Sequence, residues 1–204
     1  MNKVLRISSS ISGENSVSAL LTDELLQALE SRGNTLSVSE RNFSQTPIPH
    51  VDEQWLQALS TAEQERSPEQ QVKVAFSDEL IAEVMAADTL IIALPMYNFT
   101  VPSMLKAWID HVARAGVTFA YTQQGPKGLL KDKKVYLVAS MGGEHEAGVS
   151  DYIRPYMKLI MGFLGLTDVE IITASGLNLG PQQREAGLDA ARSEIQKLTS
   201  KAAA

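Results

Sequence analysis

Short β-branched runs alternate along the chain with longer segments in which apolar residues recur at helical spacing. Strands are predicted at residues 3–8, 35–41, 89–95, 133–140 and 168–175. Helices are predicted at residues 16–32, 53–59, 68–87, 102–115 and 152–164, and from residue 181 onward. The runs 89–95 and 133–140 are apolar almost throughout, which is typical of strands covered on both faces.

Two of the predicted helices have apolar stripes that we expect to face the core. In the first helix the stripe comprises Val17, Leu20, Leu21, Leu25, Ala28 and Leu29. In the helix 68–87 it comprises Val72, Ala75, Leu80, Ile81, Val84 and Met85. Ser67 as N-cap and Pro68 at the first helical position predict where this second helix begins.

Strands that alternate with helices predict an α/β fold, a three-layer αβα sandwich around a five-stranded parallel sheet. The length of 204 residues fits a single domain over residues 1–204. The first, third and fourth strands are expected at the centre, in the spatial order 2-1-3-4-5, with 35–41 near an edge. Ligands of such sheets lie beyond the carboxyl ends of the strands, where the strand order reverses. Three loops are therefore candidates: "SSSISGENS", "PMYNFTVP" and "SMGGEHE".

Composition narrows the range of functions. A net charge of −6 argues against a nucleic-acid groove, which depends on clustered Lys and Arg. The chain has no cysteine, hence no disulfide and no thiolate nucleophile. No apolar stretch is long enough to span a bilayer, and the N-terminus lacks a secretory signal, so a cytoplasmic protein is expected.

The first loop is rich in hydroxyls and lies directly before a predicted helix. It has neither G-x-G-x-x-G nor G-x-x-x-x-G-K-[ST], and no Lys or Arg. Free N–H groups of the first helical turn and serine hydroxyls can hold a terminal phosphate there, assisted by the helix dipole. The alternative is that Ser16 only caps the helix and the other serines decorate a loop.

The other two loops suit a flat aromatic ligand. Tyr97 and Phe99 flank Asn98, so a ring can rest on this loop while an amide group binds its polar edge. Gly142 and Gly143 let the backbone approach a ring closely and direct N–H groups at it. The alternatives are an aromatic plug in the core and an ordinary Gly-Gly turn.

Longer segments of the chain resemble one enzyme family. The stretch "PMYNFTVPSMLKAWIDHVARAGVTFAYTQQGPKGLLKDKKVYLVASMGG" is similar to the signature region of FMN-dependent NADH azoreductases, which are flavodoxin-like NAD(P)H:quinone oxidoreductases. The opening serine loop, "RNFSQTPIP", "FSDELIAEVMAADTLIIALPMYNF" and "GFLGLTDVEII" extend the resemblance over most of the chain. It implies a flavodoxin-like FMN-binding domain and a homodimer with two FMN sites at the subunit interface.

The resemblance also implies an activity and a set of cofactor contacts. The activity is two-electron reduction of quinones and reductive cleavage of azo compounds by a ping-pong route, with NADH or NADPH as donor and no catalytic side chain. The implied phosphate contacts are Ser10, Ser16, Val17 and Ser18. The implied ring contacts are Met96, Tyr97, Asn98, Phe99, Ser140, Met141, Gly142 and Gly143. Relatives often carry a polar residue in place of Val17 and a polar or basic one in place of Met141.

An aromatic segment after Gly116, "VTFAYTQQGPKGLL", is too long for a plain connection. We expect it to border the substrate pocket, with Phe119 or Tyr121 as a wall, and Phe163 is a further wall by resemblance. An acceptor pocket distinguishes an enzyme from the alternative, a flavodoxin-type electron carrier, which needs only an exposed flavin edge.

The three histidines have plain interpretations, and no metal site is expected. His111 lies among apolar helical residues and is predicted to be a packing or interface residue. His145, between two glutamates, is predicted to be part of a mobile lip, and His50 to be loop surface.

Overall fold

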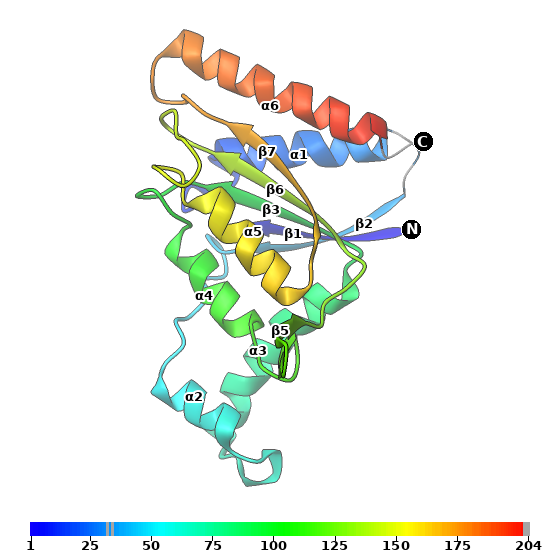
Figure 1. Cartoon of the computed structure of the whole chain (residues 1–204), viewed down its shortest axis with the longest axis vertical. Coiled ribbons are helices and arrows are strands. Elements are labelled where there is room, and N and C mark those ends of the chain that lie inside the picture. The colour runs from blue at the N-terminus through cyan, green and yellow to red at the C-terminus, as the bar shows by residue number, and fades with distance from the viewer. Residues whose placement is uncertain (32, 34, 202–204) are drawn as a thin grey trace.

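A five-stranded parallel sheet forms the centre of the computed structural model, which describes residues 1–31, 33 and 35–201 (Figure 1). In spatial order its strands are β2 (Leu36–Asn42), β1 (Asn2–Ser8), β3 (Thr89–Pro95), β6 (Lys134–Ser140) and β7 (Asp168–Ala174). All four strand pairs are parallel. The predicted strand order and the central position of the first, third and fourth predicted strands are confirmed.

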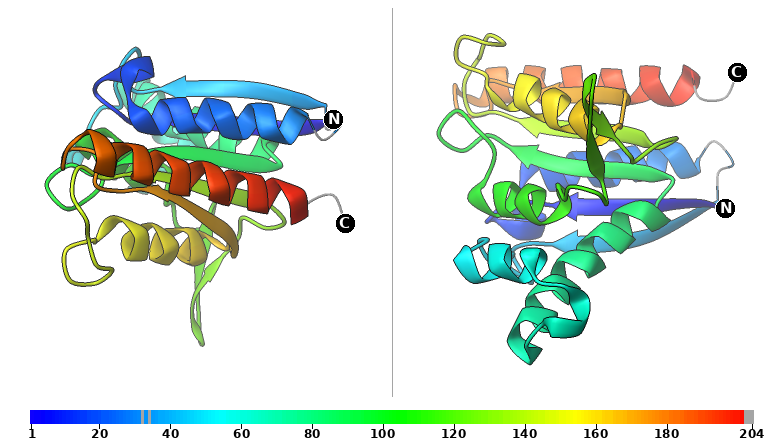
Figure 2. Two further views of the ribbon diagram at one scale, coloured as in Figure 1. Left: turned by 90° about the horizontal axis from the view of Figure 1, so that it is seen from above. Right: turned by 60° about the horizontal axis from the view of Figure 1, so that its bottom comes forward.

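Helices cover both faces of the sheet and make three layers (Figure 2). One face carries α1 (Val17–Glu30) and α6 (Pro181–Lys201), and the other carries α3 (Pro68–Ala86), α4 (Ser103–Val112) and α5 (Ile153–Leu164). The short α2 (Glu53–Ser60) packs against α3 beyond the sheet. Of the helices in the described residues, none is both long and apolar enough to cross a membrane.

The strand β3 shows how the sheet joins two cores. All seven of its residues are buried. Leu90, Ile92 and Leu94 belong to the core under α3, α4 and α5, whereas Ile91 belongs to the core under α1 and α6. Because successive side chains of a strand point to opposite faces, a continuous apolar run is what a doubly covered strand requires.

The helix starts follow their caps. The Ser16 hydroxyl accepts a hydrogen bond from the Ala19 N–H, so α1 begins at Val17. At α3, Ser67 and Gln70 form a reciprocal capping box with Pro68 at the first helical position, which confirms the predicted start.

The predicted core face of α1 is partly wrong. Leu21, Leu25 and Leu29 are buried, but Leu20 is 44% exposed and therefore lies on the solvent side of the helix. Val17 and Ala28 are half-buried at its margin. The predicted last residue, Arg32, lies outside the described residues.

The predicted core face of α3 is wrong at three positions. Val72, Ala75 and Met85 are exposed, whereas Leu80, Ile81 and Val84 are buried as predicted. The remaining buried positions of α3 are Val74 and Ser77. The Ser77 hydroxyl donates to the His111 carbonyl oxygen at 2.7 Å. Because this bond satisfies the hydroxyl, a polar residue can lie on the buried face of α3, which the apolar pattern did not predict.

The aromatic segment after α4 folds into a hairpin that the sequence pattern did not predict. Strands β4 (Phe119–Thr122) and β5 (Gly125–Gly128) pair antiparallel and stand apart from the main sheet (Figure 2). The backbone of Gly128 lies so close to the end of α5 that a Cβ there would be 2.0 Å from the Gly165 nitrogen. The hairpin is therefore docked against α5.

His111 is a packing residue, as predicted. Its Nε2 lies 3.0 Å from the Pro49 carbonyl oxygen, and its ring meets those of Trp55 and Phe76 edge to face. Burial lowers the pKa of His111, which favours the neutral ring. The described residues contain no group of His, Cys, Asp or Glu side chains arranged to hold a metal ion.

A pair of helical glycines tests the close packing of α6 on β7. A Cβ at Gly187 would lie 2.0 Å from the Ser175 carbonyl oxygen, whereas a Cβ at Gly162 in α5 meets nothing within 4 Å. We expect Gly187→Ala to lower the free energy of unfolding by about 1–3 kcal/mol, because overpacking outweighs the gain in helix propensity. Gly162→Ala is the control and should raise it by roughly 0.5–1 kcal/mol. Urea unfolding measures both, and a stabilised Gly187→Ala variant would contradict this packing.

Candidate functional site

Three loops meet at the carboxyl edge of the sheet because their strands are neighbours in register. Ser8 of β1 pairs with Ala93 of β3, and Pro95 of β3 pairs with Ser140 of β6. The following segments, residues 9–16, 96–102 and 141–152, leave the same edge, toward which the arrowheads of β3 and β6 point in Figure 1. The three loops predicted from the sequence are thus brought together.

The first loop leaves hydrogen-bond donors unused at the start of α1. The Ser16 oxygen accepts from Ala19 N–H at 3.1 Å, which leaves the Ser16 O–H free to donate elsewhere. Within the described part of the chain, the backbone N–H groups of Val17 and Ser18 have no hydrogen-bond partner. The two interpretations of Ser16 are compatible. Capping uses the Ser16 oxygen as an acceptor, and a phosphate would use the Ser16 hydroxyl as a donor.

The start of α1 can hold an anion without a basic side chain. Residues 9–16 and 96–102 contain no Lys or Arg, and the first turn of α1 has no acidic residue. A phosphate here would be held by N–H dipoles, hydroxyls and the positive end of the helix, and each hydrogen bond to an ionised group contributes about 1.5–3 kcal/mol. The residues present therefore fit a terminal monophosphate.

Tyr97 links the first two loops through its hydroxyl. The Tyr97 oxygen lies 3.0 Å from Ser10 Oγ and accepts a hydrogen bond from Ile11 N–H at 3.1 Å. Ser10 Oγ also accepts from Ser12 N–H at 3.1 Å. The Ser10 side chain is therefore held in place beside the start of α1.

The second loop is a tight turn with an unusual backbone. Tyr97 and Thr100 exchange both backbone hydrogen bonds, at 2.9 and 3.1 Å, around Asn98 and Phe99. The central residues have φ of 49° and 68°, the left-handed signs of a type I′ turn. Asn tolerates this region, but Phe does so at a cost of order 1–3 kcal/mol. The fold thus holds the Phe99 ring, 54% exposed, in a strained position at the edge of the site.

The third loop directs its carbonyl groups away from the other two loops. The Gly142 and Gly143 carbonyl oxygens accept from Asn178 N–H and Gly176 N–H, at 2.8 and 3.0 Å. A Cβ at Gly142 would lie 2.5 Å from Asn178 Nδ2, so a side chain there would displace the Asn178 amide. In the described residues the N–H groups of both glycines lack partners, as binding of a polar ring edge requires.

Met141 and Met96 lie between the loops and the core. The Met141 side chain is buried in the core under α5, and its backbone N–H and carbonyl oxygen are bonded to Ala174 and Leu177. Met96 is half-buried, and its N–H donates to the Ser140 carbonyl oxygen at 2.9 Å. Met141, where relatives often carry a polar or basic residue, therefore affects the packing of the core and not the backbone groups of the site.

His145 connects the second and third loops. Its ring meets the Phe99 ring edge to face at a centroid distance of 5.7 Å, and its Nδ1 lies 3.2 Å from Ser150 Oγ. The buried Asp151 carboxylate accepts from Ile153 N–H and pairs with Arg154, which fixes the end of this loop at the start of α5. The predicted mobility of the lip stays a prediction, but its contact with Phe99 was not foreseen.

The loop after β7 supports the third loop, a role that the sequence pattern did not indicate. Gly176, with φ of 69°, and Asn178 hold the two glycine carbonyls described above. The run "SGLNLGP" after a strand is a turn signal and marked this segment as a loop. Its pairing with residues 142–143 depends on β6 and β7 being neighbours, which the loop sequence does not reveal.

The three predicted pocket walls form a cluster of their own, the aromatic cluster Phe119, Tyr121 and Phe163. The Phe119 ring centroid lies 4.4 Å from that of Phe163 and 5.3 Å from that of Tyr121. Phe163 is in the last turn of α5, whereas the third loop enters the first turn, about 15 Å away along the helix axis. Phe163 and the third loop therefore lie at opposite ends of α5 within one chain. The role of these three side chains as walls of the substrate pocket stays a prediction.

Comparison with known sequences identifies close relatives of the chain. Residues 2–199 match the model of a family described as having a flavodoxin-like fold. The chain is 46% identical over 196 residues to an FMN-dependent NADH:quinone oxidoreductase of Alcanivorax borkumensis, covering 96% of this chain and 99% of that relative. A protein of the same name from Shewanella loihica is 46% identical over 198 residues, covering 97% and 99%.

Solved structures agree with these relatives. An azoreductase from Bacillus anthracis superimposes with a TM-score of 0.88 at 29% identity, over 98% of this chain and 100% of that chain. An FMN-dependent NADH-azoreductase of the same species, in complex with FMN, has a TM-score of 0.88 at 26% identity over 100% of both chains. Fold, loop arrangement and sequence identity lead to one conclusion: the chain belongs to the flavodoxin-like family that contains the FMN-dependent NADH:quinone oxidoreductases.

Proposed function

We propose that this protein is an FMN-dependent NADH:quinone oxidoreductase that also reduces azo compounds, with one FMN-binding domain over residues 1–204. The observation that carries the proposal is the start of α1. Two N–H groups without partners in the described residues and the Ser16 and Ser18 hydroxyls lie there, at the same edge of the sheet as the strained Asn98–Phe99 turn. The names of the relatives and of the FMN complex support the cofactor and the activity. The use of NADH supports a cytoplasmic location.

The phosphate of FMN would be bound by Ser10, Ser16, Val17 and Ser18. Val17 and Ser18 offer backbone N–H groups, so the apolar side chain at 17 does not weaken the site. The Ser16 hydroxyl donates while its oxygen keeps the Ala19 cap. Tyr97 holds Ser10 in place through the contact between their hydroxyls.

The ring system would lie between the second and third loops. The residues that would contact it are Met96, Tyr97, Asn98, Phe99, Ser140, Met141, Gly142 and Gly143. Phe99 presents an apolar face, and the unpaired N–H groups of Gly142 and Gly143 bind polar atoms of the ring edge. Bound FMN would supply the chemistry, a two-electron transfer from NADH to the acceptor. The protein orients both reactants and excludes water, and we assign no side chain as a catalytic acid or base.

The aromatic cluster fits an acceptor pocket only with a second copy of the chain. Tyr121 is 77% exposed although it is large and aromatic, and it protrudes on a hairpin away from the sheet. Since Phe163 is a full helix length from the third loop of its own chain, we infer that Phe119, Tyr121 and Phe163 border the flavin bound by a partner in a homodimer. An exposed aromatic residue such as Tyr121, next to the half-buried Phe163, is suited to contact a partner.

An anaerobic titration tests the proposed function. We expect the purified protein to be yellow, to lose its visible absorbance on addition of NADH, and to regain it when a quinone is added. Yellow protein that NADH does not bleach would instead indicate an electron carrier. Protein that is colourless and takes up no FMN would overturn the assignment of the first loop.

Replacement of Phe99 separates backbone strain from ligand binding. Phe99→Gly relieves the left-handed backbone and gives the residue pair that type I′ turns prefer, so the free energy of unfolding without FMN should rise by up to about 1 kcal/mol. FMN affinity, measured by quenching of flavin fluorescence, should fall several-fold because the ring is lost. The control Phe99→Ala should lose the same affinity without the gain in stability. Unchanged FMN affinity in both variants would remove Phe99 from the site.

Tyr121→Ala tests the second copy. We expect kcat/KM for quinones to fall about tenfold or more, while FMN affinity and the thermal midpoint change little, because one chain leaves Tyr121 exposed. The control Met85→Ala, also an exposed apolar residue, should change none of these. Light scattering shows the oligomeric state. A monomeric protein, or full activity of Tyr121→Ala towards every acceptor, would contradict the shared pocket.

A further inference from the structure

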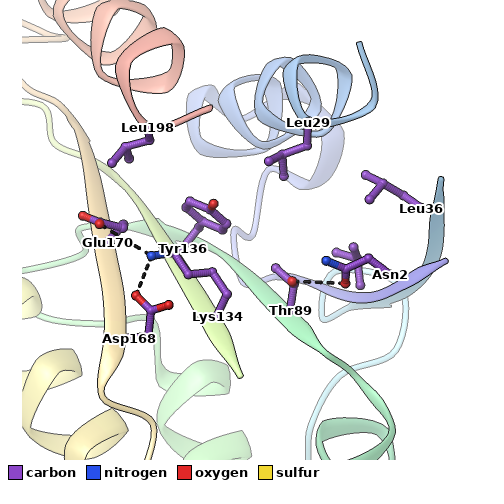
Figure 3. A pocket seen from close by; sticks show the side chains of 10 residues that line it. Asn2, Leu29, Leu36, Thr89, Lys134, Tyr136, Asp168, Glu170 and Leu198 are labelled. Carbon is purple, nitrogen blue, oxygen red and sulfur yellow. Dashed lines mark hydrogen bonds and ion pairs between the residues drawn. The ribbon is translucent and has the colours of Figure 1, made fainter. Parts of the chain in front are cut away.

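A second hollow lies at the amino edge of the sheet, opposite the three loops (Figure 3). It encloses about 440 Å³ between α1 and α6, within the range of small-molecule sites. Its floor includes Val4 of β1 and Tyr136 of β6. Nothing in the proposed reaction uses this end of the sheet.

Three leucines form apolar walls of the hollow. Leu29 comes from α1, Leu36 from β2 and Leu198 from α6, and in Figure 3 their side chains converge on the space above the sheet. Leu29 and Leu198 are buried and Leu36 is half-buried. Such walls favour an apolar ring, because burial of its surface supplies most of the binding free energy.

Tyr136 places a hydroxyl between the leucine walls of the hollow, whose lining also includes the polar residues Asn2 and Thr89. The residue is 4% exposed, and its ring points between Leu29 and Leu198 (Figure 3). Among the described residues the Tyr136 hydroxyl has no hydrogen-bond partner. Burial raises the pKa of the Tyr136 phenol, so the hydroxyl stays protonated at neutral pH and can both donate and accept. The hydroxyl lies at the surface of the hollow, where a ligand can reach it.

The rim of the hollow carries more negative than positive charge. Lys134 Nζ lies 2.5 Å from Asp168 Oδ1 and 3.5 Å from Glu170 Oε1. Burial by itself would lower the pKa of Lys134, but the hydrogen bond to Asp168 and the charges of Asp168 and Glu170 together raise it. Two carboxylates around one ammonium leave a net charge of about −1, and Glu170 is the less tightly engaged of the two. The rim therefore favours a cationic ligand and disfavours an anion.

We propose that this hollow binds a small primary amine that carries an aromatic ring. The ring would lie among Leu29, Leu36 and Leu198, where the Tyr136 hydroxyl would donate a hydrogen bond to its π face. The ammonium group would reach Glu170 at the rim. This site does not depend on the proposed function, since none of its residues belongs to the flavin loops or to the aromatic cluster.

The experiment titrates the flavin-loaded protein with 2-phenylethylamine by isothermal calorimetry, with phenylacetate as the matched anionic probe. We expect saturable binding of the amine at millimolar concentration and at least fivefold weaker binding of phenylacetate. Tyr136→Phe, which keeps the ring, and Glu170→Gln should each weaken amine binding about fivefold. The control Glu63→Gln, on a distant exposed turn, should leave it unchanged.

Several outcomes would overturn the proposal. They are equal binding of the two probes, full amine affinity in both Tyr136→Phe and Glu170→Gln, and no heat of binding at all. A change of the visible flavin spectrum on binding would place the amine at the three loops instead and would also overturn it. Leu198→Phe, which fills the hollow, should abolish binding while the flavin spectrum stays native, so a variant that fails to fold is recognised by its loss of colour.

Discussion

The register between β1, β3 and β6 is the constraint on which the candidate site depends. These strands are buried on both faces, so their side chains are committed to two cores, and only the loops at their ends remain available for a ligand. Parallel pairing of Ser8 with Ala93 and of Pro95 with Ser140 places the three loops at one edge. A slip of one residue would turn Ile91 and Ile92 to the wrong cores and move the loops apart. The same packing that stabilises the sheet therefore sets the geometry of the site.

The site uses backbone groups more than side chains. The N–H groups of Val17 and Ser18 face outward because the first turn of a helix has no internal acceptors for them. The N–H groups of Gly142 and Gly143 face outward because their carbonyls are bonded to the loop after β7. Phe99 adds an apolar ring at the expense of a strained φ. Such a site binds by position and dipoles, which suits a reaction whose chemistry resides in a cofactor.

The two ends of α5 have separate roles in the proposed enzyme. Its first turn, fixed by Asp151 and Arg154, anchors the third loop beside the flavin. Its last turn carries Phe163 against the hairpin residue Phe119, too far from that loop to serve the same site. In the homodimer that we propose, the end of one α5 would complete the pocket at the start of the other.

Local pattern by itself determined the strands and the caps Ser16 and Ser67, because these depend on periodicity and on short-range hydrogen bonds. The strand order, and with it the choice of three loops, followed from the known order of doubly wound parallel sheets. The resemblance added the individual cofactor contacts. Only the tertiary structure decided which face of α3 is buried, since its apolar residues do not define one stripe and Ser77 is satisfied by His111 from another helix. It also decided that Asn178 supports Gly142, that Phe99 is strained, and that the aromatic cluster lies at the far end of α5. These features arise from contacts between segments distant along the chain, which no local pattern encodes.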